Sequence, residues 1–193
     1  LVTAGYLEGF YYRPRIDMDL LREYSEGLIC MSACLKGVVP EKMLKGDYEG
    51  ARKEALLFSE IFQDRYYLEI QNHGIPEEEQ NLKNMKKLSQ DLNLPLVCTN
   101  DAHYAKKEHW EAHDIHICLG TGKERSDPNR LRYATPEFYF KTQDEMHKLF
   151  KEFPGAIENT RKIADSIDIT LPIGESHLPN FPIPKETNIS DPD

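Results

Sequence analysis

A carboxylate and an imidazole follow a short apolar segment in the run Val97-Cys98-Thr99-Asn100-Asp101-Ala102-His103. Side chains two positions apart in an extended chain point to the same side, so Asp101 and His103 can converge on one point. In parallel α/β proteins the carboxyl ends of the strands carry the active site. The pair therefore predicts two ligands of a divalent metal such as zinc or manganese. The alternative interpretation is that Asp101 caps a turn and His103 only packs, because the same sequence fits that arrangement as well.

Cys34 occupies a similar place, because it follows the apolar segment 28–31 and precedes Lys36-Gly37. A thiolate is a common zinc ligand, so Cys34 is a candidate third ligand. The alternative interpretation is a cysteine that only packs in a turn.

Polar residues near these positions are candidates for a supporting role. Glu69 shares one face of the segment 66–71 with Tyr67 and Gln71, and a polar face suits the neighbourhood of a metal better than a packed core. We expect three residues to orient the ligands or to line the channel that leads to them, namely Glu69, His73 and Asn100.

Two other groups carry a weaker indication. His109 and His113 lie four positions apart and could clasp a metal on one helix face, but no Glu stands between them as in HExxH, so packing and surface roles are favoured. A local basic cluster could contact DNA, or it could form an ordinary solvated loop. Its members are Lys123, Arg125, Arg130 and Arg132.

Strands that alternate with helices are needed to position these residues. Apolar runs predict strands at 28–31, 66–71, 95–100 and 138–140, and helical patterns predict helices at 47–62, 76–92, 107–119, 143–153 and 155–167. Asp47 can cap the first helix, Pro76 suits the first turn of the second, and Gly120 is expected to end the third.

The predicted order β-α-β-α-β implies parallel strands joined by helical crossovers. The fold class is therefore α/β, and an open doubly wound sheet and a closed barrel both fit. From residue 171 onward the chain is rich in proline and has no helical period, which predicts an extended linker.

The composition limits the partners that the chain can have. Its 193 residues carry a formal net charge of −9, which argues against nucleic-acid binding by the chain alone, because such affinity comes from neutralising phosphates. No apolar run approaches the ~20 residues of a membrane helix, and no signal peptide begins at Leu1. Its four irregularly spaced cysteines predict free thiols and a cytoplasmic location.

Several blocks along the chain share one resemblance. They are Gly5–Tyr12, Pro14–Asp17, Met31–Gly37, Tyr67–Gly74, Thr99–Tyr104, His113–Lys123, Asp127–Arg130, Phe138–Lys141 and Pro179–Pro182. In this order they resemble the PHP domain (polymerase and histidinol phosphatase) of bacterial DNA polymerase III alpha subunits. The resemblance implies a distorted seven-stranded β/α barrel with a metal cluster at the carboxyl ends of its strands.

The resemblance also implies a division of the chain and a ligand set. Residues 1–170 would be the C-terminal portion of the PHP domain, and 171–193 a linker toward the polymerase palm. Cys34, Asp101 and His103 correspond to the last three ligands of family members with an intact site. The earlier ligands include an HxH pair that this sequence does not contain. We therefore expect the chain alone to lack the N-terminal part of the domain, to bind metal weakly and to be inactive.

The function implied is DNA replication, with a metal-dependent phosphoesterase in the PHP domain that could act as a 3′–5′ proofreading exonuclease. The Mg-dependent polymerase site would lie outside this chain. The expected partners are DNA, mainly through other domains, and other replicase subunits that include a proofreading subunit, with no membrane. Two alternatives remain: a non-catalytic scaffold that stabilises the polymerase and docks a separate proofreading subunit, and a stand-alone histidinol-phosphatase-like phosphoesterase.

Overall fold

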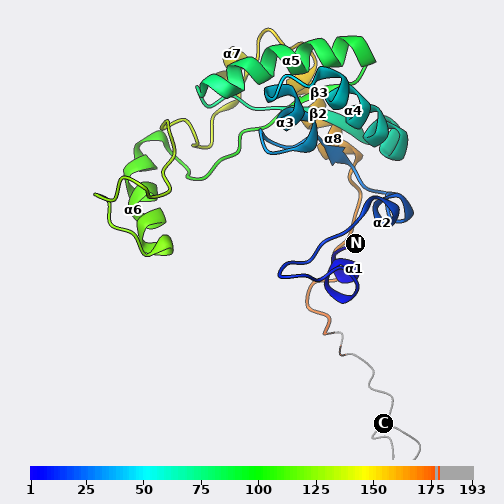
Figure 1. The fold of residues 1–193 in the computed structure, drawn as a ribbon, viewed down its shortest axis with the longest axis horizontal. Coiled ribbons are helices and arrows are strands. Elements are labelled where there is room, and N and C mark those ends of the chain that lie inside the picture. The colour runs from blue at the N-terminus through cyan, green and yellow to red at the C-terminus, as the bar shows by residue number, and fades with distance from the viewer. Residues whose placement is uncertain (177, 179–193) are drawn as a thin grey trace, which may run out of the picture.

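Three short parallel strands form the sheet in a computed structural model that describes residues 1–176 and 178 (Figure 1). Their order is β1-β2-β3, with β1 at Cys30–Met31, β2 at Tyr66–Ile70 and β3 at Leu96–Cys98. Met31 pairs with Tyr67, and Ile70 pairs with Cys98. The predicted α/β class with parallel strands is confirmed. The described strands form an open sheet, as a part of a β/α barrel would.

Helices and 3-10 turns connect and cover the strands. In chain order they are α1 (Val2–Leu7), α2 (Met18–Glu23), α3 (Val38–Leu44), α4 (Tyr48–Phe62), η1 (Gln63–Arg65), α5 (Pro76–Leu92), η2 (Lys107–His109), α6 (Trp110–Thr121), α7 (Gln143–Leu149) and α8 (Ala156–Ser166).

The core lies between the sheet and its covering helices. Tyr66, Leu68 and Ile70 of β2 are buried, whereas Tyr67 and Glu69 between them are half-buried. This alternation confirms the predicted two-faced strand. The buried face packs in one apolar cluster with residues of α3, α4 and α5, among them Val39, Ala55, Met85 and Leu88.

Local chemistry fixes the ends of several helices. Asp47 caps α4 as predicted, because its carboxylate accepts from the Gly50 N–H at 2.9 Å. Pro76 is the first residue of α5, where its missing N–H costs nothing. The N-terminal end of α8 is held against β3 by a buried hydrogen bond of 2.7 Å, which the Asn159 amide donates to the Leu96 carbonyl.

Several of the sequence predictions were wrong. The helix predicted at 143–153 ends at Leu149. The segment 138–140 forms no strand but a single parallel bridge between Tyr139 and Tyr104, since η2 begins three residues beyond Tyr104 and turns the partner chain away. Helix α6 ends at Thr121 rather than at Gly120, because Gly122 adopts the left-handed conformation of the cap (φ 63°). Helices α1, α2 and α3, of six, six and seven residues, were not predicted.

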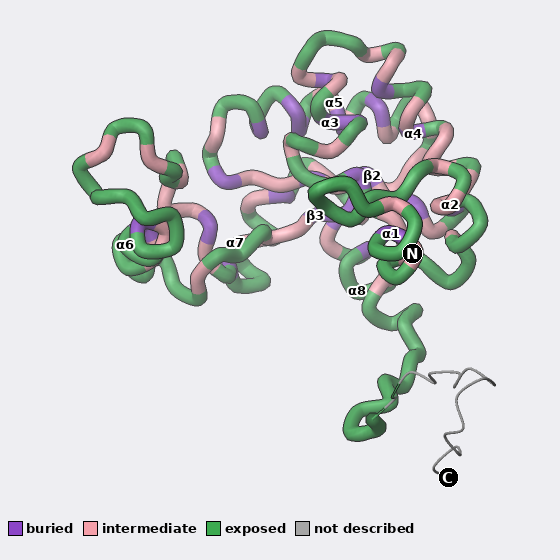
Figure 2. The backbone as a smooth tube through the Cα atoms, turned by 60° about the horizontal axis from the view of Figure 1, so that its bottom comes forward, coloured by how far each residue is buried: buried purple, intermediate pink, exposed green. Residues whose placement is uncertain are grey.

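Helix α6 and its flanking loops, residues 105–135, project away from the sheet (Figure 1). We call this segment the α6 arm. Figure 2 shows that it is mostly exposed, and α6 buries only Asp114 and Cys118. The bridge between Tyr104 and Tyr139 fastens the base of the arm, together with a 2.8 Å bond from the His103 N–H to the Phe138 carbonyl.

None of the described helices combines the length and the apolar character that a membrane crossing requires. Most of the predicted linker 171–193 lies outside the described residues.

Candidate functional site

Asp101 and His103 lie together just beyond the carboxyl end of β3. Asp101 Oδ1 is 3.4 Å from His103 Nε2, and the two side chains remain 40% and 34% exposed. Asp101 has a positive φ of 42°, a conformation that costs a non-glycine residue free energy unless its surroundings hold it. The structure therefore brings the two predicted residues together, with their polar atoms accessible.

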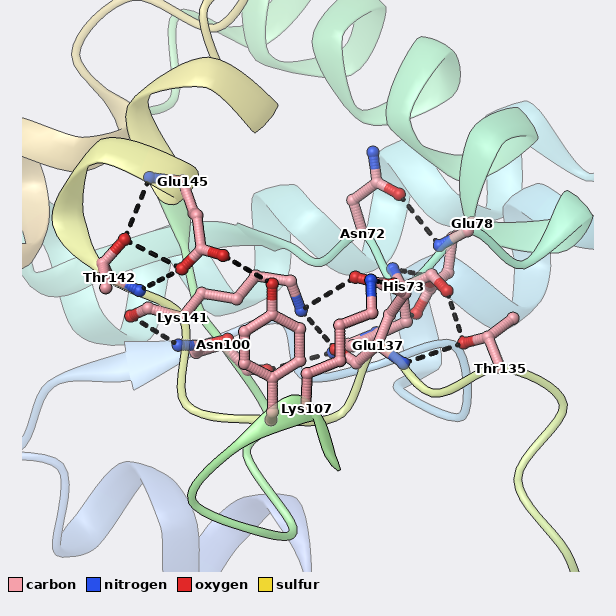
Figure 3. A network of polar contacts seen from close by, with 12 residues as sticks. Asn72, His73, Glu78, Asn100, Lys107, Thr135, Glu137, Lys141, Thr142 and Glu145 are labelled. Atoms are coloured by element: carbon pink, nitrogen blue, oxygen red, sulfur yellow. Dashed lines mark hydrogen bonds and ion pairs between the residues drawn. The ribbon is translucent and has the colours of Figure 1, made fainter. Parts of the chain in front are cut away.

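His73, at the end of β2, holds the backbone next to this pair. Its ring is buried, and its Nε2 donates to the Asn100 carbonyl at 3.0 Å. The ring stacks on Phe138 with a centroid distance of 4.1 Å and an interplanar angle of 5°. Figure 3 shows His73 between Glu78 and Thr135, and the Thr135 hydroxyl donates to the His73 carbonyl at 2.6 Å. His73 thus joins three segments of the chain at the carboxyl edge of the sheet.

Glu78 completes this arrangement from the first turn of α5. Its carboxylate accepts from His73 Nδ1 at 2.7 Å and from the His73 backbone N–H at 2.5 Å. Burial acts to raise the pKa of Glu78, but the hydrogen bonds from the His73 side chain and backbone outweigh it and hold that pKa below its ordinary value. Both ring nitrogens of His73 therefore face oxygen atoms of the protein, which fixes the orientation of the ring.

Asn100 and Glu69, the two other predicted supporting residues, hydrogen-bond to neighbouring segments of the chain rather than to Asp101 or His103. With its amide nitrogen donating to the Tyr139 carbonyl at 3.1 Å, the Asn100 side chain also accepts from the Lys141 N–H at 2.8 Å. Glu69 accepts from Thr99 and Gln71 on the polar face of the sheet. Among the residues that the structure describes, no hydrogen bond or ion pair joins Glu69 to Asp101 or His103.

Cys34 lies in a tight turn after β1, at the same edge of the sheet. Ala33 before it has a positive φ of 65°, and the Gly37 N–H donates to the Cys34 carbonyl at 2.8 Å. A Cβ at Gly37 would lie 2.1 Å from the Ser32 carbonyl oxygen, so only glycine fits this turn. The Cys34 side chain is exposed. All four cysteines are free thiols, as predicted from their spacing.

The predicted cluster of Cys34, Asp101 and His103 is not formed. Within residues 1–176 and 178, no three His, Cys, Asp or Glu side chains converge as a metal site. The strand order explains this result, because β1 and β3 are separated by β2, or roughly 10 Å of sheet. The donor types suit zinc, but the described geometry offers only the Asp101–His103 pair. The described residues alone therefore supply two neighbouring candidate ligands and not a complete metal site.

Tyr133 and His113, two residues of the α6 arm, surround His103 instead. The Tyr133 hydroxyl lies 3.2 Å from His103 Nε2, and the His113 ring centroid is 5.8 Å from that of His103. Burial, with the neighbouring His103 and His116, lowers the pKa of His113 and favours its neutral form. The predicted role of His113 in packing is consistent with its ring contacts. Tyr133 carried no signal in the sequence, since 30 residues separate it from His103.

The basic cluster of the arm is largely paired. Arg130 forms a bidentate bond with Asp114, at 2.5 and 2.8 Å, and Lys123 pairs with Asp127 at 3.0 Å. Arg125 makes longer contacts, of 3.4 Å to Glu111 and 3.5 Å to Asp114. Arg132 has no hydrogen bond or ion pair with any described residue. Only part of the predicted basic surface therefore remains available to an anion.

Comparison with known proteins finds a matching family model and several similar proteins. The family model described as PHP domain matches residues 1–73. Proteins named DNA polymerase III subunit alpha are 47% identical over 191 residues in Borreliella burgdorferi, 42% over 187 in Treponema pallidum and 40% over 197 in Campylobacter jejuni. These alignments cover 96–97% of this chain, and the chain spans about 16% of the length of each of these relatives. The first 73 residues therefore match the PHP domain family, and the chain as a whole is similar to one segment of DNA polymerase III alpha subunits.

Proposed function

We propose that residues 1–170 are part of the PHP domain of a replicative DNA polymerase and contribute Asp101, His103 and Cys34 to a metal-dependent phosphoesterase centre. The observation that carries this proposal is the convergence of Asp101 and His103 beyond β3, at the edge of the sheet where Cys34 follows β1. The alpha-subunit names of the relatives support the role in DNA replication.

The side chains of this edge have separate tasks in the proposal. Asp101 and His103 offer an accessible carboxylate and imidazole, and the buried His73–Glu78 pair holds the backbone that aims Asp101. A divalent zinc or manganese ion bound by them would activate water for attack on a phosphodiester. Since the described residues do not complete a ligand set, the remaining ligands come from parts of the longer protein beyond this chain.

The same proposal assigns the polymerase activity elsewhere. The nucleotidyl-transfer site with its Mg²⁺ belongs to a palm domain outside this chain, and residues 171–193 are the linker toward it. DNA and other replicase subunits, a proofreading subunit among them, are the proposed partners of the whole protein. The phosphoesterase centre would act as a 3′–5′ exonuclease on the strand that the palm extends.

A scaffold role is the second candidate, and a specific observation favours it. The described residues hold no complete metal-binding group, yet four aromatic side chains near the N-terminus are more than half exposed. They are Tyr6, Phe10, Tyr11 and Tyr12. Exposed aromatic clusters are typical of surfaces that bind another protein, so the domain would dock a separate proofreading subunit.

A nuclease assay on the full-length protein separates the two candidates. The substrate is a 3′-labelled single strand, assayed with Zn²⁺ or Mn²⁺, and the metal content of the protein is measured in parallel. The phosphoesterase proposal expects Asp101→Asn and His103→Ala to lose at least 10²-fold in hydrolysis and to lose bound metal, with polymerase activity retained. Asp168→Asn, an exposed carboxylate beyond α8, is the matched control. Unchanged hydrolysis in Asp101→Asn would leave the scaffold role.

A further inference from the structure

A pocket of about 680 Å³ opens in the α6 arm, directly beside His103. Its lining includes Tyr104, Trp110 and three arginines, Arg125, Arg130 and Arg132. His113 and Tyr133, the two residues that contact His103, also line it. The pocket and the Asp101–His103 pair therefore share a wall. The volume falls within the range of about 300–1,000 Å³ that is usual for small-molecule sites, and it accommodates one nucleotide.

The arginines of this pocket differ in how strongly neighbouring residues bind their guanidinium groups. The guanidinium of Arg130 donates to the Asp114 carboxylate and to backbone carbonyls. Arg130 therefore stabilises the pocket wall and is not available to a ligand. Arg125 is exposed and held only by contacts of 3.4 and 3.5 Å. Arg132 is exposed and unpaired among the described residues. Two arginines can thus turn toward an anion without breaking a short bond, and guanidinium groups match the geometry of phosphate.

Aromatic surface lies next to these cations. Trp110 is 43% exposed, and the rings of Tyr133 and His113 are 5.3 Å apart by their centroids. The Tyr104 hydroxyl is buried and has no hydrogen-bond partner among the described residues. Arginine next to exposed aromatic rings is the combination that binds single-stranded nucleic acid, because bases stack on the rings while cations bind the phosphates. An acidic peptide would make no comparable use of the rings.

We propose that this pocket binds one nucleotide of a single-stranded nucleic acid, with Arg132 and Arg125 on a phosphate and Trp110 stacked on the base. This nucleotide pocket extends the proposed function, because the bound strand would continue from the pocket toward Asp101 and His103. Binding itself requires neither metal nor hydrolysis. Because the chain is acidic overall, the affinity depends on these local cations and falls steeply with salt.

Trp110 provides the readout, as it is the single tryptophan of the chain. The 193-residue protein is titrated in EDTA with an oligothymidylate of eight nucleotides, and Trp110 fluorescence is recorded. We expect saturable quenching that inorganic phosphate does not reproduce. Arg132→Gln should weaken binding about tenfold, the loss expected for a charge-assisted hydrogen bond. It should also make the salt dependence shallower by about 0.7 in log K against log salt, one phosphate contact on a single strand.

Arg52→Gln is the matched control, because Arg52 is an exposed arginine of α4, outside the pocket. It removes the same charge and should leave the affinity unchanged. Arg125→Gln provides a second pocket variant, and thermal melting confirms that each variant is folded. The proposal is overturned if the oligonucleotide does not quench Trp110, if Arg52→Gln weakens binding as much as Arg132→Gln, or if polyglutamate quenches equally well.

The outcome also separates this proposal from the preceding one. Asp101→Asn should retain oligonucleotide binding in EDTA, whether or not it abolishes hydrolysis by the full-length protein. Binding without any hydrolysis would keep the nucleotide pocket and reject the phosphoesterase. Hydrolysis that depends on Asp101, with no quenching of Trp110, would do the reverse.

Discussion

The imidazole of His73 donates to the carbonyl oxygen of Asn100 at 3.0 Å, and so ties the end of β2 to the residue that precedes Asp101. Glu78 holds the other ring nitrogen. These contacts make the candidate site depend on a buried, hydrogen-bonded pair that lies outside it. Asp101 keeps its positive φ because the neighbouring backbone is fastened in this way.

Replacing His73 by Ala is expected to destabilise the protein by about 3–5 kcal/mol, because it leaves the Glu78 carboxylate buried without its partner. Urea denaturation monitored by circular dichroism measures the change. His147→Ala, at an exposed position of α7, is the matched control and should shift stability by no more than about 0.5 kcal/mol. A loss of the same small size in His73→Ala would show that the pair does not hold the edge of the sheet.

The acid sensitivity of the fold should depend on Glu78. Its pKa in the folded protein lies below the ordinary value of 4.5, so the folded state binds this proton less readily than the unfolded chain. The resulting stabilisation is fully present above pH 4.5 and is lost as the pH falls through the lowered pKa. Glu78→Gln should therefore be less stable than the native protein at pH 7 and should lose less additional stability between pH 5 and 3. Parallel curves for the two proteins would contradict this assignment.

The sequence predictions were most accurate for features that depend on residues close together in the chain. Asp47 and Pro76 begin helices as their single backbone interactions predict. Asp101 and His103 do lie together as expected, but Asp101 has a positive φ of 42°, so the extended backbone from which their proximity was predicted is not present there. The position of Cys34 depended instead on the order of the strands in the sheet, which no local pattern encodes. The contacts of His73 with Asn100 and Phe138 join residues 27 and 65 positions apart, so they too appear only in the folded chain.

Cysteine reactivity should distinguish Cys34 from the other thiols. Burial raises the pKa of Cys30 and of Cys98 to about 11, so few thiolates form there at pH 8, and Cys118 is buried. Cys34 is exposed, and we expect a disulfide reagent such as DTNB to show one fast phase of one thiol per chain, followed by slow phases. Cys34→Ser should abolish the fast phase, whereas Cys98→Ser should keep it. A fast phase that survives Cys34→Ser would place the reactive thiol elsewhere.

Arg130 and Asp114 hold the α6 arm in shape. Their side chains are only 7% and 11% exposed and meet in a bidentate bond, whereas α6 buries almost no apolar surface. Removing one partner of such a pair destabilises the protein by more than the intact pair stabilises it, because the remaining charge stays buried without a partner. Arg130→Gln should therefore unfold the arm locally and leave the core, which is built by β2 and the helices around it, close to its native stability.

Hydrogen exchange resolved by segment tests this separation. Amides of residues 110–121 should exchange at least about tenfold faster in Arg130→Gln, equivalent to roughly 1.4 kcal/mol of lost local stability, with those of β2 and α5 unchanged. Lys123→Gln is the control, because its exposed pair with Asp127 at 3.0 Å is worth at most about 1 kcal/mol. Faster exchange throughout the protein would mean that the arm and the core unfold as one unit. In that case the nucleotide pocket could not open or close independently of the sheet that carries Asp101 and His103.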